Sequence, residues 1–287
     1  MGALGTVITA IVTPFHEDGR VDEETFVSLL HHLAAHGSDG FAVCGTTGEA
    51  ATLNDEEHLR VIELAVQERP ASTTIIAGTG SNDTRHAVAM TERATALGVD
   101  ATLSVTPYYN KPNRRGITAH YEAVARATDK PIVLYNIPGR TATNMPPDLL
   151  AELAQIDNVS AVKQANGDEL APVDGLEVYA GDDGNFARVL DFGGAGGVLV
   201  ASHIVGDEMR RMVDEPENRA AIDAALRDVY ETLFMTASPT CTKAALNMLG
   251  LIDGEHLRLP MVPADDAERA AVRSMLERHG LLETAAR

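Results

Sequence analysis

A single lysine is the residue in this sequence best placed to act as a nucleophile. Lys163 ends the apolar run Val159–Lys163, and a turn-forming cluster follows it. Side chains of a strand alternate between two faces, so Val159, Ala161 and Lys163 are expected to share the buried face. An apolar environment disfavours the charged form of an amine and makes the amine more nucleophilic. This position is suited to a Schiff-base lysine, although a lysine that extends from a strand end into water fits the stretch equally well.

Further polar clusters follow other apolar runs. They supply hydroxyl, phenol, guanidinium and carboxylate groups, and they are Gly45–Glu49, Thr106–Pro112, Tyr135–Arg140 and Gly181–Asp183. Each cluster alone has a simpler explanation, because such residues also form turns, pack by their rings, pair with surface charges or cap helices. Their joint occurrence is the specific feature. The other lysines are Lys111, Lys130 and Lys243, and none of them ends an expected strand.

Short apolar runs alternate with amphipathic stretches along the chain. The expected strands are Val7–Val12, Gly40–Cys44, Thr74–Gly78, Ala101–Val105, Ile132–Tyr135, Val159–Lys163, Glu177–Ala180 and Gly197–Val200. The expected helices include Asp22–His36, Asn54–Arg69, Asp83–Leu97, Gly116–Thr128, Pro147–Gln155 and Asn185–Phe192. Eight such repeats predict an α/β fold, a (β/α)8 TIM barrel of parallel strands. The carboxyl ends of the strands meet on one face of a barrel, which would gather the polar clusters into one site.

An open doubly wound sheet is the alternative architecture. It is less favoured because Gly45–Gly48 lacks the lysine of a phosphate-binding loop, and no glycine-rich fingerprint follows the first strand. After Val200 the strand pattern stops, and three further helices are expected at Glu217–Met235, Pro239–Leu249 and Asp265–His279. We therefore expect a barrel that carries the active site over residues 1–204. A barrel-closing helix and a C-terminal helical appendage are expected over 205–287.

Composition excludes several classes of partner. The formal net charge of −19 argues against nucleic acid and against an anionic membrane surface. No run approaches the roughly 20 apolar residues of a membrane helix. The two cysteines, Cys44 and Cys241, lie far apart without metal-ligand spacing, so we expect no metal site and a cytoplasmic protein.

Taken together, these motifs resemble those of the dihydrodipicolinate synthase / N-acetylneuraminate lyase family of pyruvate-dependent lyases. The resemblance is carried by Thr9–Phe15, Gly45–Glu49, Val105–Pro112, Tyr135–Thr141, Val162–Lys163, Gly181–Asp183 and Lys243–Leu246. The segment Tyr135–Thr141 is similar to the synthase branch. That branch implies condensation of pyruvate with L-aspartate 4-semialdehyde in lysine and diaminopimelate biosynthesis. It also implies no cofactor and a homotetramer built as a dimer of dimers.

The resemblance also implies roles for individual residues. Lys163 would carry pyruvate as an imine, and Arg140 would bind the carboxylate of the aldehyde substrate. Tyr135 would exchange protons through Thr46 and through Tyr109, which a neighbouring subunit would supply. Thr47 would hold the pyruvate carboxylate, and Gly181 and Val200 would also bind substrate.

A regulatory pocket for lysine is implied by the same resemblance. It would comprise Ala50, His58, Asn82, His86 and Tyr108. His86 replaces a glutamate of lysine-sensitive members and cannot supply its negative charge, so we expect little inhibition by lysine. Ala50 replaces a serine, and His203 replaces an asparagine of many members. An Asn-Pro commonly opens the segment that reads Ala237-Ser238-Pro239 here.

Three alternative functions remain open on the sequence. The protein could be another 2-keto-acid aldolase of the same family, or a catalytically silent paralogue that binds a keto acid. A metal-dependent aldolase is disfavoured because the expected strand ends lack histidine ligands.

Overall fold

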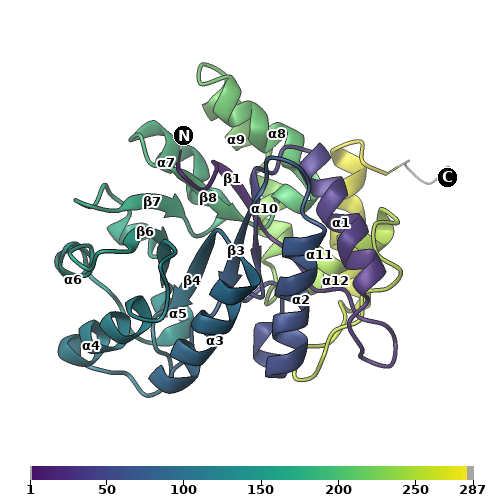
Figure 1. Cartoon of the computed structure of the whole chain (residues 1–287). Coiled ribbons are helices and arrows are strands. Elements are labelled where there is room, and N and C mark those ends of the chain that lie inside the picture. The colour runs from purple at the N-terminus through teal and green to yellow at the C-terminus, as the bar shows by residue number, and fades with distance from the viewer. Residues whose placement is uncertain (1, 283–287) are drawn as a thin grey trace, which may run out of the picture.

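The computed structural model describes residues 2–282 as a closed barrel of eight parallel strands surrounded by helices (Figure 1). The strands pair in chain order, and β8 closes the barrel against β1. They are β1 Val7–Ala10, β2 Gly40–Val43, β3 Thr74–Gly78, β4 Ala101–Val105, β5 Ile132–Asn136, β6 Val159–Gln164, β7 Glu177–Ala180 and β8 Gly196–Leu199. The predicted (β/α)8 fold is therefore confirmed.

Helices cover the outside of the barrel, seven of them between successive strands and α8 after β8. They are α1 Glu23–Ala35, α2 Asp55–Gln67, α3 Thr84–Leu97, α4 Arg114–Ala125, the short α5 Pro138–Thr141, α6 Pro147–Leu153, α7 Phe186–Asp191 and α8 Ser202–Asp214. The helix starts follow from local chemistry. The Asp22 carboxylate accepts the Thr25 N–H, and Asn54 forms a capping box with Glu57.

The strands separate two apolar layers. The barrel interior is filled by the side chains of Ile8, Ala42, Ile76, Leu103, Val133, Ala161, Tyr179 and Val198. A second layer between strands and helices includes Leu29, Ile62, Leu134, Leu150 and Val162. Burial of both faces explains why the strands are rich in apolar residues, and polar strand residues such as Thr9, Thr102 and Ser104 are buried as well.

Strand β6 contains an irregularity that changes the predicted facing of one residue. Ile132 of β5 pairs with Val159, but the next residue, Val133, pairs with Ala161, so Ser160 is an extra residue in the ladder. Val159 consequently packs in the outer layer, and its predicted place on the lysine's face is wrong. Ala161 does face the barrel interior, as predicted. The shift does not propagate, because regular pairing resumes at Ala161.

The C-terminal region contains more helices than the periodicity indicated. They are α9 Arg219–Ala225, α10 Arg227–Leu233, α11 Thr240–Met248 and α12 Asp266–Arg278. The expectation of one helix over Glu217–Met235 is wrong, because the chain turns at the buried Leu226. This turn lets α10 pack against α11 and α12, a tertiary preference that periodicity does not register. In Figure 1, α11 and α12 lie on the side of the barrel that α1 and α2 cover, whereas α9 lies beside α8 at the top of the view.

The expected boundary between residues 204 and 205 falls inside α8. The backbone of α8 leaves helical geometry at Val205, with φ −126° and ψ 41°. The division into 1–204 and 205–287 stays a prediction, and its end residues 1 and 283–287 lie outside the described residues. Within residues 2–282, no helix combines the length and the apolar character needed to cross a membrane.

Candidate active site

Lys163 and Tyr135 lie side by side at the carboxyl ends of β6 and β5. They are paired in register, and Lys163 Nζ lies 4.2 Å from the centroid of the Tyr135 ring. Lys163 is 6% exposed and Tyr135 is 5% exposed, so the lysine does not extend into water. A cation above an aromatic ring is attracted to the negative face of the ring. The barrel thus holds an amine against a phenol in a nearly enclosed position.

A cavity of about 440 Å³ opens near this pair. Its lining includes three predicted active-site residues, Thr46, Tyr135 and Arg140, and four residues of the predicted regulatory pocket, Ala50, His58, His86 and Tyr108. The two predicted sites therefore share one continuous hollow in a single chain. In the described part of the chain, Lys163, Thr47, Gly181, Val200, Asn82 and Tyr109 are not part of that lining. The volume is within the usual range for small-molecule sites.

The loop after β2 contains two threonines in different environments. Thr46 is exposed in the wall of the cavity, where its hydroxyl can exchange protons with a bound molecule. Thr47 is buried, and its Oγ1 accepts a hydrogen bond of 3.5 Å from Ser238 Oγ. The loop thus presents one hydroxyl to the cavity and holds the other against the C-terminal region.

Arg140 lies on the short helix α5 directly after β5. Its side chain is exposed and lines the cavity, so the guanidinium can reach an anion bound there. The buried Asn136 holds the segment that follows α5, because its amide group accepts from Met145 N at 3.0 Å. The same amide donates to Asn144 Oδ1 at 2.9 Å and to Gln164 Oε1 at 3.1 Å.

The ends of β7 and β8 contribute Gly181 and Val200. A Cβ on Gly181 would lie 2.6 Å from the Cβ of Ala165, so no larger residue fits beside the end of β6. Val200 packs in the barrel interior, and its N–H donates to Asp183 Oδ1 at 2.9 Å. Asp183 is fully buried, and burial raises its pKa to about 6.

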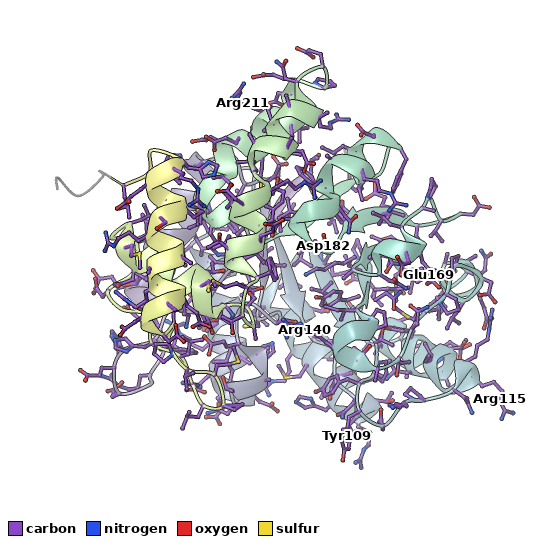
Figure 2. The ribbon with its side chains drawn as sticks, turned by 180° about the vertical axis from the view of Figure 1, so that it is seen from behind. Tyr109, Arg115, Arg140, Glu169, Asp182 and Arg211 are labelled. Carbon is purple, nitrogen blue, oxygen red and sulfur yellow. The ribbon has the colours of Figure 1, made fainter. Side chains whose placement is uncertain are left out.

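Tyr109 lies apart from the cavity of its own chain. Its side chain is 87% exposed, and its φ of +72° is unusual for a residue other than glycine. Figure 2 shows it at the outer edge of the molecule, whereas Arg140 lies nearer the middle of the view. The neighbouring backbone is tied by Asn82, which donates to the Tyr108 carbonyl at 3.2 Å. The single chain therefore does not bring Tyr109 to Tyr135.

Two of the predicted regulatory residues are held by hydrogen bonds to groups outside the predicted set. His86 Nε2 lies 2.9 Å from Asp55 Oδ1, and this hydrogen bond holds the pKa of Asp55 below its usual value. His58 Nε2 donates to the Gly78 carbonyl at 2.7 Å, and burial lowers the pKa of His58. An acidic group thus lies beside His86 at the cavity wall.

Three supporting residues had no assigned role in the sequence. Asn136 and Asp183 are described above. His203 accepts from the Val12 N–H at Nε2, and its Nδ1 donates to the Val200 carbonyl at 2.8 Å. Burial lowers the pKa of His203 to about 4, so the neutral ring joins the ends of β1 and β8. The sequence contains one local signal for such supporting residues. A polar residue directly after Tyr135 or Lys163, such as Asn136, must point its side chain to the opposite face of the strand.

Residues 2–282 contain no group of three or more His, Cys, Asp or Glu side chains arranged to hold a metal ion. Comparison with known proteins then places the chain. The model of the dihydrodipicolinate synthetase family matches residues 3–279. The chain belongs to the dihydrodipicolinate synthetase family.

Several relatives within the dihydrodipicolinate synthetase family are similar over almost their whole length. The chain is 42% identical over 279 residues to "4-hydroxy-tetrahydrodipicolinate synthase 1" of Halalkalibacterium halodurans, covering 93% of this chain and 94% of the relative. The dihydrodipicolinate synthase of Cyanidioschyzon merolae with lysine bound superposes with a TM-score of 0.93 at 39% identity, covering 98% and 100% of the chains. The chloride-inhibited enzyme of Acinetobacter baumannii complexed with pyruvate gives a TM-score of 0.93 at 35% identity, with the same coverage.

Proposed function

We propose that the protein is a 4-hydroxy-tetrahydrodipicolinate synthase. This lyase condenses pyruvate with L-aspartate 4-semialdehyde in the biosynthesis of diaminopimelate and lysine. The family membership and the names of relatives about 40% identical over nearly the whole chain support the reaction. The pyruvate complex of the Acinetobacter baumannii relative supports pyruvate as the first substrate.

The pairing of Lys163 with Tyr135 is the observation that carries the chemical part of the proposal. The neutral amine of Lys163 attacks the ketone carbon of pyruvate, water leaves, and an imine forms. Loss of a proton from the methyl group converts the imine to an enamine, whose terminal carbon then attacks the aldehyde carbon. Tyr135 lies in contact with the amine, so it is placed to move these protons.

Separate anchors for the two carboxylates complete the proposed site. Thr47 and nearby backbone N–H groups bind the pyruvate carboxylate, and Gly181 and Val200 complete that pocket. Arg140 binds the carboxylate of the semialdehyde, because its planar guanidinium matches two oxygens at once. Thr46 passes protons between Tyr135 and the Tyr109 of a neighbouring subunit.

We further propose a homotetramer and a cytoplasmic location. The exposed Tyr109 ring supports a contact with another copy of the chain. The two thiols, Cys44 and Cys241, are free and buried, as is usual in a reducing compartment. The proposed reaction needs neither a metal nor an organic cofactor, because the Lys163 imine itself stabilises the carbanion character.

Reductive trapping tests the proposal. Borohydride added with pyruvate should fix a single adduct per chain on Lys163, located by mass spectrometry of the digested protein. Lys163→Ala should abolish the adduct, and Lys130→Ala should serve as a matched lysine control that keeps it. Arg140→Ala should keep the adduct but raise the KM for the semialdehyde by roughly tenfold to a hundredfold, the effect of losing a charge-assisted hydrogen bond.

The alternatives give different results. An adduct on Lys111 or Lys243, or none, would contradict the Schiff-base assignment. Normal trapping with turnover of a different aldehyde would identify another aldolase of the family. Trapping without turnover of any aldehyde in a panel would identify a silent keto-acid binder.

A further inference from the structure

Lys243 is a second buried amine that the proposed chemistry does not use. Its side chain on α11 is fully buried, and Nζ lies 2.6 Å from Glu49 Oε1. It also donates to the His256 carbonyl at 2.8 Å and lies 4.3 Å from the centroid of the Phe15 ring. Burial lowers the pKa of Lys243, while the Glu49 carboxylate opposes that shift. The amine is thus enclosed by protein groups.

Glu49 ends the loop that carries Thr46 and Thr47. Its backbone is left-handed, with φ +53°, and its N–H donates to the Thr46 carbonyl at 3.1 Å. The side chain of Glu49 is 3% exposed. Two buried charges lose much hydration energy, and an ion pair offsets this only in good geometry with further hydrogen bonds. Removing either partner would therefore disturb the loop at Glu49, where the backbone is left-handed.

Arg258 extends this contact to the surrounding elements. Its backbone N–H donates to Glu49 Oε2 at 3.2 Å, and its guanidinium pairs with both carboxylate oxygens of Glu57 on α2. The guanidinium also donates to the carbonyls of Gly19 and Thr52. Both oxygens of the Glu49 carboxylate are consequently held by the C-terminal segment.

The residues just before Glu49 are held by two further hydrogen bonds. Thr13 Oγ1 donates to the Gly48 carbonyl at 2.7 Å, and Ser238 Oγ, which lies just before α11, donates to Thr47 Oγ1. The Thr47–Glu49 part of the loop is therefore held from two sides, by Thr13 after β1 and by Ser238 and Lys243 of the C-terminal region. The C-terminal helices reach the proposed pyruvate anchor through these contacts.

We propose that Glu49 and Lys243 are positioning residues that hold the Thr46–Thr47 loop in the geometry needed to bind pyruvate. The C-terminal region then supports pyruvate binding as well as packing against the barrel. The inference rests on the proposed function, because it assigns the loop to pyruvate. It also excludes Lys243 as a nucleophile, since its fully buried amine is bonded to Glu49 and to the His256 carbonyl.

Two variants of the pair and one matched control test the inference. Glu49→Gln keeps the shape of the side chain but removes its charge, and Glu49→Gln with Lys243→Met removes both charges. Glu57→Gln is the control, because it removes a carboxylate from the same Arg258 network away from the loop. The measurements are the KM for each substrate and hydrogen exchange of a peptide covering residues 45–50.

The pair variants should raise the KM for pyruvate by roughly tenfold to a hundredfold, because small displacements of a binding group have effects of this size. The KM for the semialdehyde should change little, since Arg140 lies on a different segment. The backbone N–H groups of Glu49 and Ala50 should exchange faster than in the wild type. Glu57→Gln should leave both the pyruvate KM and this exchange unchanged.

The exchange measurement separates the inference from the proposed function. Unchanged exchange in residues 45–50 would overturn the inference whatever the enzyme catalyses. A lowered melting temperature with wild-type KM for pyruvate would make the pair purely structural and would also overturn it. If the double variant does not fold, Glu49→Gln alone decides. Faster exchange in a protein whose wild type traps no pyruvate would support the positioning role and reject the proposed function.

Discussion

Asp183 has a buried carboxyl group in which one oxygen accepts hydrogen bonds and the other does not. Oδ1 accepts the N–H groups of Val200 and Ala201, whereas Oδ2 has no hydrogen-bond partner among the described residues. Burial raises the pKa of Asp183 from 3.8 to about 6. The folded protein therefore binds this proton more tightly than the unfolded chain, and the resulting stability is lost as the pH rises from about 4 through about 6.

Asp183→Asn should remove this dependence, because the amide keeps an acceptor for the two N–H groups and does not ionise. Relative to the wild type, the variant should gain roughly 3 kcal/mol in free energy of unfolding between pH 4 and pH 7, the equivalent of about two pKa units. Urea unfolding of both proteins over this range measures the difference, in which the other titrating groups cancel. A difference that stays constant with pH would contradict the prediction.

His86 is the residue that should decide the response to lysine. An ammonium group in the cavity would meet Asp55, but the Asp55 carboxylate is already paired with His86 at 2.9 Å. We therefore predict little inhibition by lysine at concentrations that inhibit lysine-sensitive relatives. His86→Glu should create or deepen inhibition, because it adds a negative charge and frees Asp55. Rate measurements with increasing lysine at neutral pH test both proteins.

Arg85→Glu is a matched control for His86→Glu. It places the same charge on the same helix at an exposed position outside the cavity lining. Strong inhibition of the wild type would show that another acid, Asp55 or Asp83, binds the ammonium group despite His86. Identical lysine-inhibition curves for the wild type and His86→Glu would show that something other than the missing charge at position 86 prevents lysine from binding in this pocket.

At the scale of elements, β5 and β6 are joined outside the barrel by the Asn136 side chain. It links Gln164, the neighbour of Lys163, to the segment at Asn144 and Met145 that follows α5. One amide thus supports both the lysine strand and the helix that carries Arg140.

Asn136→Ala should destabilise the fold by roughly 1–3 kcal/mol, because it leaves the buried Met145 N–H without its acceptor. It should also raise the KM for the semialdehyde. Asn158→Ala is the matched control. Asn158 lies just before β6, at the end opposite to Lys163, and its side chain donates to the carbonyls of Ala125 and Thr128, so the substitution should affect stability only. Thermal unfolding and steady-state kinetics measure the two effects. An equal rise in the KM for the semialdehyde in Asn136→Ala and Asn158→Ala would contradict a positioning role for Asn136.

At the scale of the whole molecule, Tyr109 is a predicted catalytic residue that the single chain leaves on its surface, apart from the cavity. Its loop is held at Tyr108 and Asn110, which bond with Asn82, while its ring is 87% exposed. A large aromatic ring fixed in this way on the surface suits a contact between copies of the chain. The proposed relay therefore requires assembly.

Mixed assemblies test this requirement. Tyr109→Phe and Lys163→Ala chains should each be inactive, and mixing them should restore part of the activity after subunits exchange. The mixed assemblies then contain some sites in which Lys163 of one chain and Tyr109 of its neighbour are both intact. Mass spectrometry of the intact assemblies verifies the exchange. Absence of recovery in verified hybrids would mean that Tyr109 acts within its own chain or has no role.

The sequence by itself determined the eight-stranded barrel, most of its outer helices and the lysine next to the end of β6. These features depend on local patterns. Apolar runs and helix caps such as Asn54 with Glu57 act over a few residues, and the rule that strand ends share one face then gathers the polar clusters.

Only the tertiary structure decided which residues meet across the chain. The extra residue at Ser160 moved Val159 to the outer layer, and packing against α11 and α12 divided the helix expected over Glu217–Met235. The pairing of Glu49 with Lys243 joins residues 194 positions apart. The physical reason is that burial and register are set by contacts from several elements at once. A lysine on a late helix therefore has the same local pattern whether it lies in water or forms a buried ion pair.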